Sequence, residues 1–290
     1  MNNWQIALPI TGIKTNIAPV KIGPIMISRL KADQFPSGTI ENVNSLAISM
    51  GSDEKFSHED DFDVIEFLED ALGIFRVFVA NGTGGPAALN IITKRKLWNY
   101  SEIYSINTTS PEASESLKLL PSLRRYEYRL TEEKLADFQA NHISELLYTL
   151  LDIHKKKKIN ELDLLITKST VWCGLMLEDV FYRDRFLRGV TALEALFEKS
   201  KMQYISKKFS ILGSKLYRMS NTQSDIKTVE SDLKKIYKAR CEISHGGQFA
   251  GNKFGVTLME FEYIITQICC SAIHLWKTSS SVKNFYDKIV

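Results

Sequence analysis

An arginine and a histidine near the end of one helical stretch are the residues of this chain best suited to chemistry. The stretch Asp232–Gly247 reads DLKKIYKARCEISHGG, and its apolar residues recur every three or four positions, which predicts a helix with one buried face. Gly246 and Gly247 end that helix, because glycine readily adopts the left-handed conformation found just past a helix end. Arg240 falls on the apolar face and requires an anionic partner, while His245 lies in the last turn, where the helix dipole favours its protonated form. A permanent cation and a titratable group at one helix end suit reactions at a phosphodiester.

The spacing of these two residues limits how they can act together. Arg240 and His245 are five positions apart, so on an ideal helix their side chains point about 140° away from each other. A joint site therefore requires either a last turn that frays or two copies of the helix that meet across a twofold axis. The alternative is structural: Arg240 binds a buried carboxylate and His245 only caps the helix.

The wider pattern resembles a known family. The order Tyr237-x-x-Arg240-x-x-x-x-His245-Gly246-Gly247 resembles the R-x4-6-H motif of the HEPN-domain ribonucleases, and its context is similar to the branch called Apea-like HEPN. The glycines and the tyrosine make the match more specific than an arginine and a histidine alone.

An upstream segment supports the same resemblance. Phe186–Phe197 (FLRGVTALEALF) resembles an earlier core helix of that branch, which carries a glutamate, here Glu194. The resemblance covers roughly Leu175–Trp276. It implies an all-helical, HEPN-like bundle that works as a homodimer, in which the facing motif helices build one cleft. It also implies a role in prokaryotic antiviral defence or toxin-like RNA cleavage.

The chemistry expected in such a cleft is RNA cleavage. His245 would act as general base or acid at the ribose 2′-hydroxyl or the leaving 5′-oxygen. Arg240 would stabilise the negative charge that grows on the phosphate. Attack by the 2′-hydroxyl restricts the substrate to RNA, leaves a cyclic phosphate and needs no metal or other cofactor. The predicted function is a metal-independent endoribonuclease. The alternatives are a HEPN-like module that binds RNA or a nucleotide without cutting it, and a purely structural or regulatory helical partner.

Four further residues could support the site. Glu194 could orient the histidine or hold the fork of Arg240, or it could be a solvated helix residue. Ser244 and Cys241 flank the motif and either line the cleft or are incidental. Many active members of the family carry a small polar residue where this chain has Cys241, a departure that favours the non-catalytic alternative. Tyr237 could stack on a base or belong to the core.

Positive charge gathers around the motif. The segment Lys199–His245 holds eleven lysines and arginines against four acidic residues, a net charge of +7, whereas the whole chain carries +3. A basic surface of this kind attracts RNA by releasing counterions, and Lys234, Lys235 and Lys238 are the predicted RNA-binding residues. The alternative is the ordinary solvated face of several helices.

The rest of the composition narrows the class of protein. The four cysteines have neither a C-x-x-C pattern nor paired zinc spacing, so we expect reduced thiols and no metal site. The N-terminus lacks the pattern of a signal peptide, and the chain has no uncharged apolar run of about 18 residues. We therefore expect a soluble, cytoplasmic protein without a membrane partner.

The distribution of proline divides the chain. All seven prolines lie at or before Pro121, and proline is poorly tolerated inside helices. The sequence therefore predicts an α+β protein: a mixed, strand-containing domain over residues 1–130, which would sense a trigger or select a target, and an all-helical domain over residues 131–290.

Hydrophobic periodicity predicts the individual elements. The expected strands are Trp4–Leu8, Lys21–Arg29, Ile74–Ala80, Ala88–Thr93, Leu97–Ile106 and Arg124–Leu130, with a loop over Asn107–Pro121. The expected helices are Glu59–Leu72, Thr131–His154, Asn160–Leu177, Asp179–Lys199, Gln203–Tyr217, Asp225–His245 and Val256–Trp276.

Overall fold

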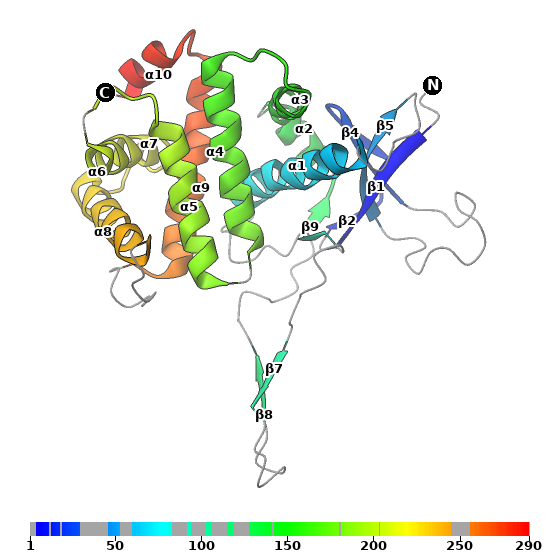
Figure 1. Ribbon diagram of the computed structural model, residues 1–290, viewed down its shortest axis with the longest axis horizontal. Coiled ribbons are helices and arrows are strands. Elements are labelled where there is room, and N and C mark those ends of the chain that lie inside the picture. Colours follow the sequence, from blue (N-terminus) through cyan, green and yellow to red (C-terminus); the bar gives the residue numbers. More distant parts are fainter. Residues whose placement is uncertain are drawn as a thin grey trace.

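A computed structural model describes residues 4–11, 13–17, 19–29, 46–52, 60–82, 92–93, 102–105, 115–118, 128–140, 142–179, 181–202, 204–244 and 256–289. A small region of strands comes first and a helical region follows, which confirms the predicted α+β class (Figure 1). After residue 131, every described element is a helix.

The main sheet has the strand order β3-β4-β5-β1-β6, and its neighbouring strands are antiparallel. The strands are β1 (Trp4–Thr11), β3 (Val20–Ile22), β4 (Ile25–Arg29), β5 (Leu46–Ser52) and β6 (Ile92–Thr93). Buried and exposed residues alternate along β3 and at the start of β4, as expected for a sheet with one face on the core.

The expected single strand Lys21–Arg29 is wrong, because the chain turns in its middle. Gly23 has a φ of 57°, a left-handed conformation that glycine adopts without a steric penalty. This turn separates β3 from β4 and makes them a hairpin. A Cβ at Gly23 would lie 3.1 Å from the carbonyl oxygen of Ser144, so the hairpin turn also sits close to helix α3 (Ile143–His154).

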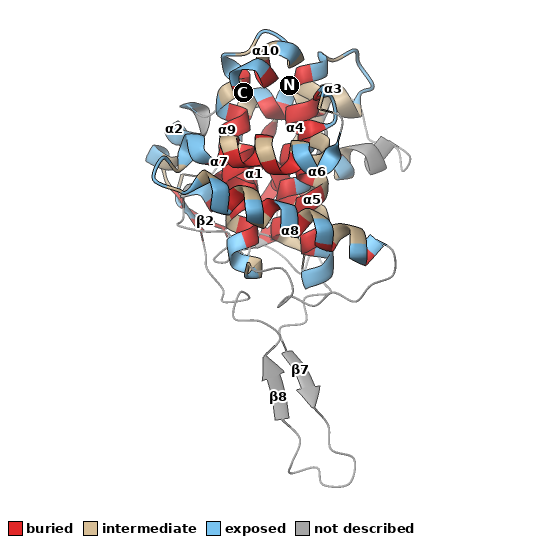
Figure 2. Ribbon diagram, turned by 90° about the vertical axis from the view of Figure 1, so that its left-hand side faces the viewer, coloured by how far each residue is buried: buried red, intermediate tan, exposed pale blue. Residues whose placement is uncertain are grey.

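The expected strand Ile74–Ala80 is also wrong, since these residues continue helix α1 (Asp60–Gly82). Residues 71–80 are all buried, and α1 runs from the sheet into the helical region, where it packs against α3, α4 (Glu161–Glu178) and α9 (Leu258–Lys277) (Figures 1 and 2). A helix buried on every side has no polar stripe, so its apolar run resembles that of a buried strand.

The remaining strands form two small pairs. Strand β2 (Ile13–Thr15) pairs in parallel with β9 (Tyr128–Leu130), and β7 (Glu102–Ser105) pairs antiparallel with β8 (Glu115–Lys118). Strands β6, β7 and β9 lie within expected strand segments, but β8 lies where a loop was expected. Cross-strand pairing with β7 decides this segment, and its own Ser- and Pro-rich composition does not reveal that partner.

The expected single helix Thr131–His154 is two helices, α2 (Glu132–Ala140) and α3. His142 separates them with a φ of 62°, and its imidazole lies 3.2 Å from the carboxylate of Glu145 in the first turn of α3. Histidine is among the residues that enter the left-handed region more readily than most, so the break has a local cause.

The other expected helices are confirmed. They correspond to α4, α5 (Tyr182–Phe197), α8 (Ile226–Ser244) and α9, and a final helix, α10 (Val282–Ile289), follows. The expected helix Gln203–Tyr217 consists of α6 (Ile205–Lys207), a π-helical segment η5 (Lys208–Leu212) and α7 (Gly213–Ser220).

One hydrophobic core extends through both regions, from Leu8 in β1 to Ile289 in α10. Helix α1, which precedes the expected boundary at residue 130, lies against α4 within this core. The division into domains 1–130 and 131–290 stays a prediction.

Two buried ion pairs link the central helices. Arg76 of α1 approaches Glu178 of α4, with Nη2 and Oε1 3.2 Å apart, and Arg185 of α5 approaches Glu262 of α9, with Nε and Oε1 2.8 Å apart. Burial raises the pKa of Glu262 to about 7, and the charge of Arg185 offsets only part of that shift. None of the described helices combines the length and the apolar character that a membrane span requires.

Candidate functional site

Helix α8 carries Arg240, and Asp225 forms the N-cap at the start of this helix. The carboxylate of Asp225 accepts hydrogen bonds from the hydroxyl of Thr228 at 2.7 Å and from the backbone N–H of Lys227 at 3.1 Å. This is the N-cap arrangement that satisfies free N–H groups at a helix start. The Thr228 hydroxyl, followed by the Lys227 N–H, lowers the pKa of Asp225.

The buried face of α8 lies next to Arg240 and does not include it. The buried residues are Val229, Leu233, Ile236, Ala239 and Ile243. The expectation that an arginine occupies an apolar position is therefore corrected. Ala239 takes that position, and the adjacent arginine lies at its edge, with a side chain that is 35% exposed.

Glu194 of α5 holds the guanidinium of Arg240. The Nε and Oε1 atoms are 3.2 Å apart, and Nη2 donates to Oε2 at 3.2 Å, so both carboxylate oxygens face one edge of the fork. Two parallel contacts of this kind fix the orientation of an arginine as well as its position. The structure thus brings together two predicted site residues that are 46 positions apart in the sequence.

The Arg240–Glu194 pair borders a pocket of about 310 Å³ between α5, α8 and the η5 segment. Its apolar lining comes from Leu193, Phe197, Ile205 and Phe209, and its charged lining from Glu194, Glu198, Lys208 and Arg240. The Lys208 amine also donates to the backbone carbonyl of Glu198 at 3.4 Å. The pocket therefore offers an apolar interior bordered by two carboxylates and two cations, of which Arg240 and Lys208 are the groups that could contact an anionic ligand.

Tyr237 and Cys241 lie beside this pocket. The Tyr237 ring packs against Phe209, with centroids 5.4 Å apart, and the side chain is half-buried. Burial is the main reason that the pKa of Tyr237 is raised, and Cys241 and Glu194 contribute further. Tyr237 therefore belongs to the edge of the core, and its stacking on a base stays a prediction. Ser244 is exposed at the last residue of α8.

The predicted catalytic histidine, His245, lies outside the described residues, as do Gly246 and Gly247. The described part of α8 ends at Ser244, directly before it. The meeting of Arg240 and His245 in one cleft, whether within a chain or across a homodimer, remains a prediction.

Two of the three predicted RNA-binding lysines are already paired. The Lys234 amine lies 2.7 Å from Glu230, and the Lys235 amine lies 2.9 Å from Asp232. Lys238 is exposed and makes no ion pair with a carboxylate that the structure describes. These contacts offset part of the positive charge of this helix, and they leave Lys238 as the lysine of this group best placed to meet a phosphate.

Lys208, Phe209 and Glu198 border the site but were not predicted as site residues. They come from the η5 segment and from the end of α5, and no spacing pattern connects them with Arg240. Only the packing of three helices places them together. Within the described ranges, no cluster of three or more His, Cys, Asp or Glu side chains could hold a metal ion.

Comparisons of the chain with models of protein families, with curated proteins and with solved structures give no match.

Proposed function

We propose that the chain is a metal-independent endoribonuclease whose site is built from Arg240 and His245 at a homodimer interface. The observation that supports this proposal is the geometry of Arg240. Its guanidinium is part-exposed at the border of a pocket and is held there in one orientation by Glu194. A cation that is fixed before the substrate arrives stabilises a growing negative charge without having to reorganise.

In this proposal each residue has a distinct role. His245 takes the proton from the ribose 2′-hydroxyl or returns one to the 5′-oxygen that leaves. Arg240 uses the N–H groups that do not face Glu194 to contact the phosphate. Lys208, which also lines the pocket, adds positive charge where the RNA backbone would pass. The products are a cyclic phosphate end and a free 5′-hydroxyl.

The family resemblance alone supports the biological setting. A cytoplasmic role in prokaryotic antiviral defence or toxin-like RNA cleavage, with the first region sensing a trigger or selecting a target, belongs to this proposal by analogy.

One observation favours a second candidate, a module that binds RNA or a nucleotide without cutting it. Glu194 occupies the Nε and Nη2 edge of Arg240, which is an edge that could otherwise form a fork with a phosphate. Cys241, in place of a small polar residue, also fits this candidate.

Incubating a fluorescent RNA with the protein in EDTA tests the proposal. We expect cleavage that leaves a cyclic phosphate, and no cleavage of a DNA of the same sequence. The changes Arg240→Ala and His245→Ala should each lower the rate by about 10²-fold or more, the usual effect of losing an acid–base or charge-stabilising group. The matched controls are Arg218→Ala and His274→Ala, which remove an exposed arginine from α7 and an exposed histidine from α9.

The outcomes separate the candidates. Equal loss of activity in the site variants and in their controls would refute the assigned residues. RNA binding without cleavage supports the module, and neither binding nor cleavage supports a structural partner. A composite site also predicts that activity per chain falls on dilution, as the dimer dissociates.

A further inference from the structure

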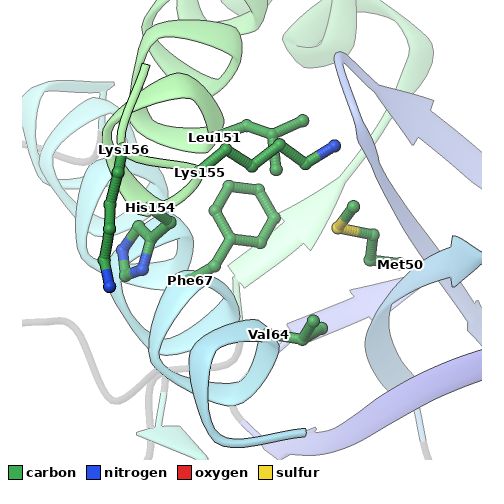
Figure 3. Close-up of a pocket in the computed structure, with 7 residues that line it drawn as sticks. All are labelled: Met50, Val64, Phe67, Leu151, His154, Lys155 and Lys156. Carbon is green, nitrogen blue, oxygen red and sulfur yellow. The ribbon is translucent and has the colours of Figure 1, made fainter. Parts of the chain in front are cut away.

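A second pocket lies between the main sheet, α1 and the end of α3 (Figure 3). It has a volume of about 320 Å³, at the lower end of the range typical of small-molecule sites. Its seven lining residues are Met50, Val64, Phe67, Leu151, His154, Lys155 and Lys156. The pocket shares no residue with the one beside Arg240.

One part of this pocket is apolar. Phe67 is buried, and Met50, Val64 and Leu151 are half-buried and leave apolar surface open to the pocket. Figure 3 shows the Phe67 ring between His154 on one side and Met50 and Val64 on the other. Flexible and branched aliphatic side chains suit a hydrocarbon chain. Among the described residues that line the pocket, none has an amide or hydroxyl side chain that could recognise the hydrogen-bonding edge of a base.

The other part is positively charged and partly fixed. The Nε2 atom of His154 lies 3.1 Å from a carboxylate oxygen of Asp70, and its ring meets Phe67 edge-on, with centroids 5.8 Å apart. Lys155 and Lys156 follow directly and are exposed, and neither pairs with a carboxylate of the described chain. The next lysine, Lys157, differs from them, because its amine lies 2.7 Å from Asp152.

The backbone at Lys156 ends helix α3 and holds the basic border of the pocket in place. Its φ is 53°, in the left-handed region where glycine usually ends a helix. Its N–H donates to the Ile153 carbonyl and that of Lys157 to the Asp152 carbonyl, the hydrogen bonds of a Schellman motif. A lysine at this position is strained, because its Cβ meets a steric penalty that glycine avoids.

We propose that this pocket binds a small aliphatic carboxylate. The hydrocarbon body would lie against Met50, Val64 and Leu151. The carboxylate would face Lys155, whose side chain extends toward the Met50 side of Phe67, whereas the Lys156 amine lies on the other side, beside His154 (Figure 3). At about 30 Å³ for each non-hydrogen atom, the volume that water occupies in the liquid, the pocket holds roughly ten such atoms. This size matches the ten carbons of a medium-chain fatty acid such as decanoate, with its carboxylate outside at the border, and excludes a lipid with two long chains.

Decanoate is the probe for this proposal, used below its micellar range with the full chain. We expect one decanoate per chain in a calorimetric titration. In NMR spectra of protein labelled at its methionine methyl groups, the Met50 resonance is identified as the one that Met50→Leu removes. This resonance should shift when decanoate is added. Decanol, which lacks the charge, and decylammonium, which reverses it, should bind at least about tenfold more weakly, since both lose a charge-assisted contact.

Matched variants locate the ligand. Lys155→Glu should weaken decanoate binding about tenfold or more, whereas Lys158→Glu, an equal charge change at an exposed neighbour outside the pocket, should leave it unchanged. Met50→Trp and Val64→Trp should each block binding by filling the pocket, and circular dichroism identifies the variant that stays folded.

Several results would overturn the proposal. They are the absence of a shift at Met50, equal effects of Lys155→Glu and Lys158→Glu, or equal binding of decylammonium and decanoate. If the lysines only offset the negative end of α3, Lys155→Glu lowers stability and decanoate does not bind. Capture of the chain by phosphatidylglycerol vesicles that depends on Lys155 would show a membrane contact instead of a site for a free acid.

Discussion

Replacing Gly174 with alanine should strongly destabilise the protein, whereas the same change at Gly73 should not. These two glycines face each other where α1 crosses α4. A Cβ built on Gly174 lies 2.1 Å from the carbonyl oxygen of Gly73, and its next neighbours are also backbone atoms. A Cβ built on Gly73 has its nearest neighbour, the carbonyl oxygen of Val171, at 3.4 Å, which is an ordinary contact.

The magnitude follows from what must move. To restore an ordinary separation of about 3.5 Å, the two helices must move apart by roughly 1 Å or more, because no flexible side chain can yield. Overpacking costs about 1–3 kcal/mol, and a clash between two backbones should reach the upper end, about 3 kcal/mol for Gly174→Ala. Such a loss lowers the unfolding temperature by roughly 6–12 °C in a chain of this size. Gly73→Ala should not lower the free energy of unfolding and should raise it by up to about 1 kcal/mol, since alanine favours the helix.

Urea unfolding followed by far-ultraviolet circular dichroism measures both variants against the unchanged chain. The ratio of the two effects is the test, since each variant adds one methyl group at the same crossing. Equal destabilisation by both changes, or a Gly174→Ala variant within about 1 kcal/mol of the parent, would show that the helices do not approach as closely as described.

Four further predictions concern charge and strain. Burial raises the folded-state pKa of Glu262 from 4.5 to about 7. As the pH rises, the unfolded state therefore loses this proton before the folded state does. Stability should therefore fall by up to about 3 kcal/mol between pH 4.5 and 7. Urea unfolding across this range should show the fall in the parent but not in Glu262→Gln, and a rise specific to the parent would contradict it. The backbone N–H of Thr257 lowers the pKa of Glu260, so the ionised carboxylate stabilises the folded protein. This stabilisation should be lost as the pH falls through the lowered pKa, and Glu260→Gln should abolish that pH dependence in urea unfolding. Glu194→Gln should slow RNA cleavage roughly tenfold while stability, measured by urea unfolding, changes by less than about 1 kcal/mol, because the ion pair is part-exposed; unchanged cleavage would refute its positioning role. Lys156→Gly should raise the free energy of unfolding by about 1 kcal/mol in urea unfolding, and a loss of stability would argue against strain at that residue.

Local sequence signals predicted the helices well where one side is exposed. Helix α8 shows this, because its apolar residues repeat along one face and its polar residues occupy the other. The same reasoning failed for Ile74–Ala80, which is helical but buried on every side. Burial on all sides removes the contrast between apolar and polar positions on which periodicity depends.

The candidate site divides in the same way. The sequence offered Glu194, a charged residue in an apolar stretch, as a carboxylate for Arg240 or His245 or as a solvated helix residue, and the structure pairs it with Arg240. Lys208 and Phe209 were not predicted as site residues, since nothing in their own segment identifies the helix they meet.

The sequence by itself determined the α+β class and the helical second half, because both depend on residue type and local spacing. The tertiary structure alone decided that Gly73 meets Gly174, that α1 continues through the core, and that His154 joins Asp70 beside a pocket. Local spacing reports which side of an element is buried. The elements that meet there depend on close packing between segments far apart in the chain.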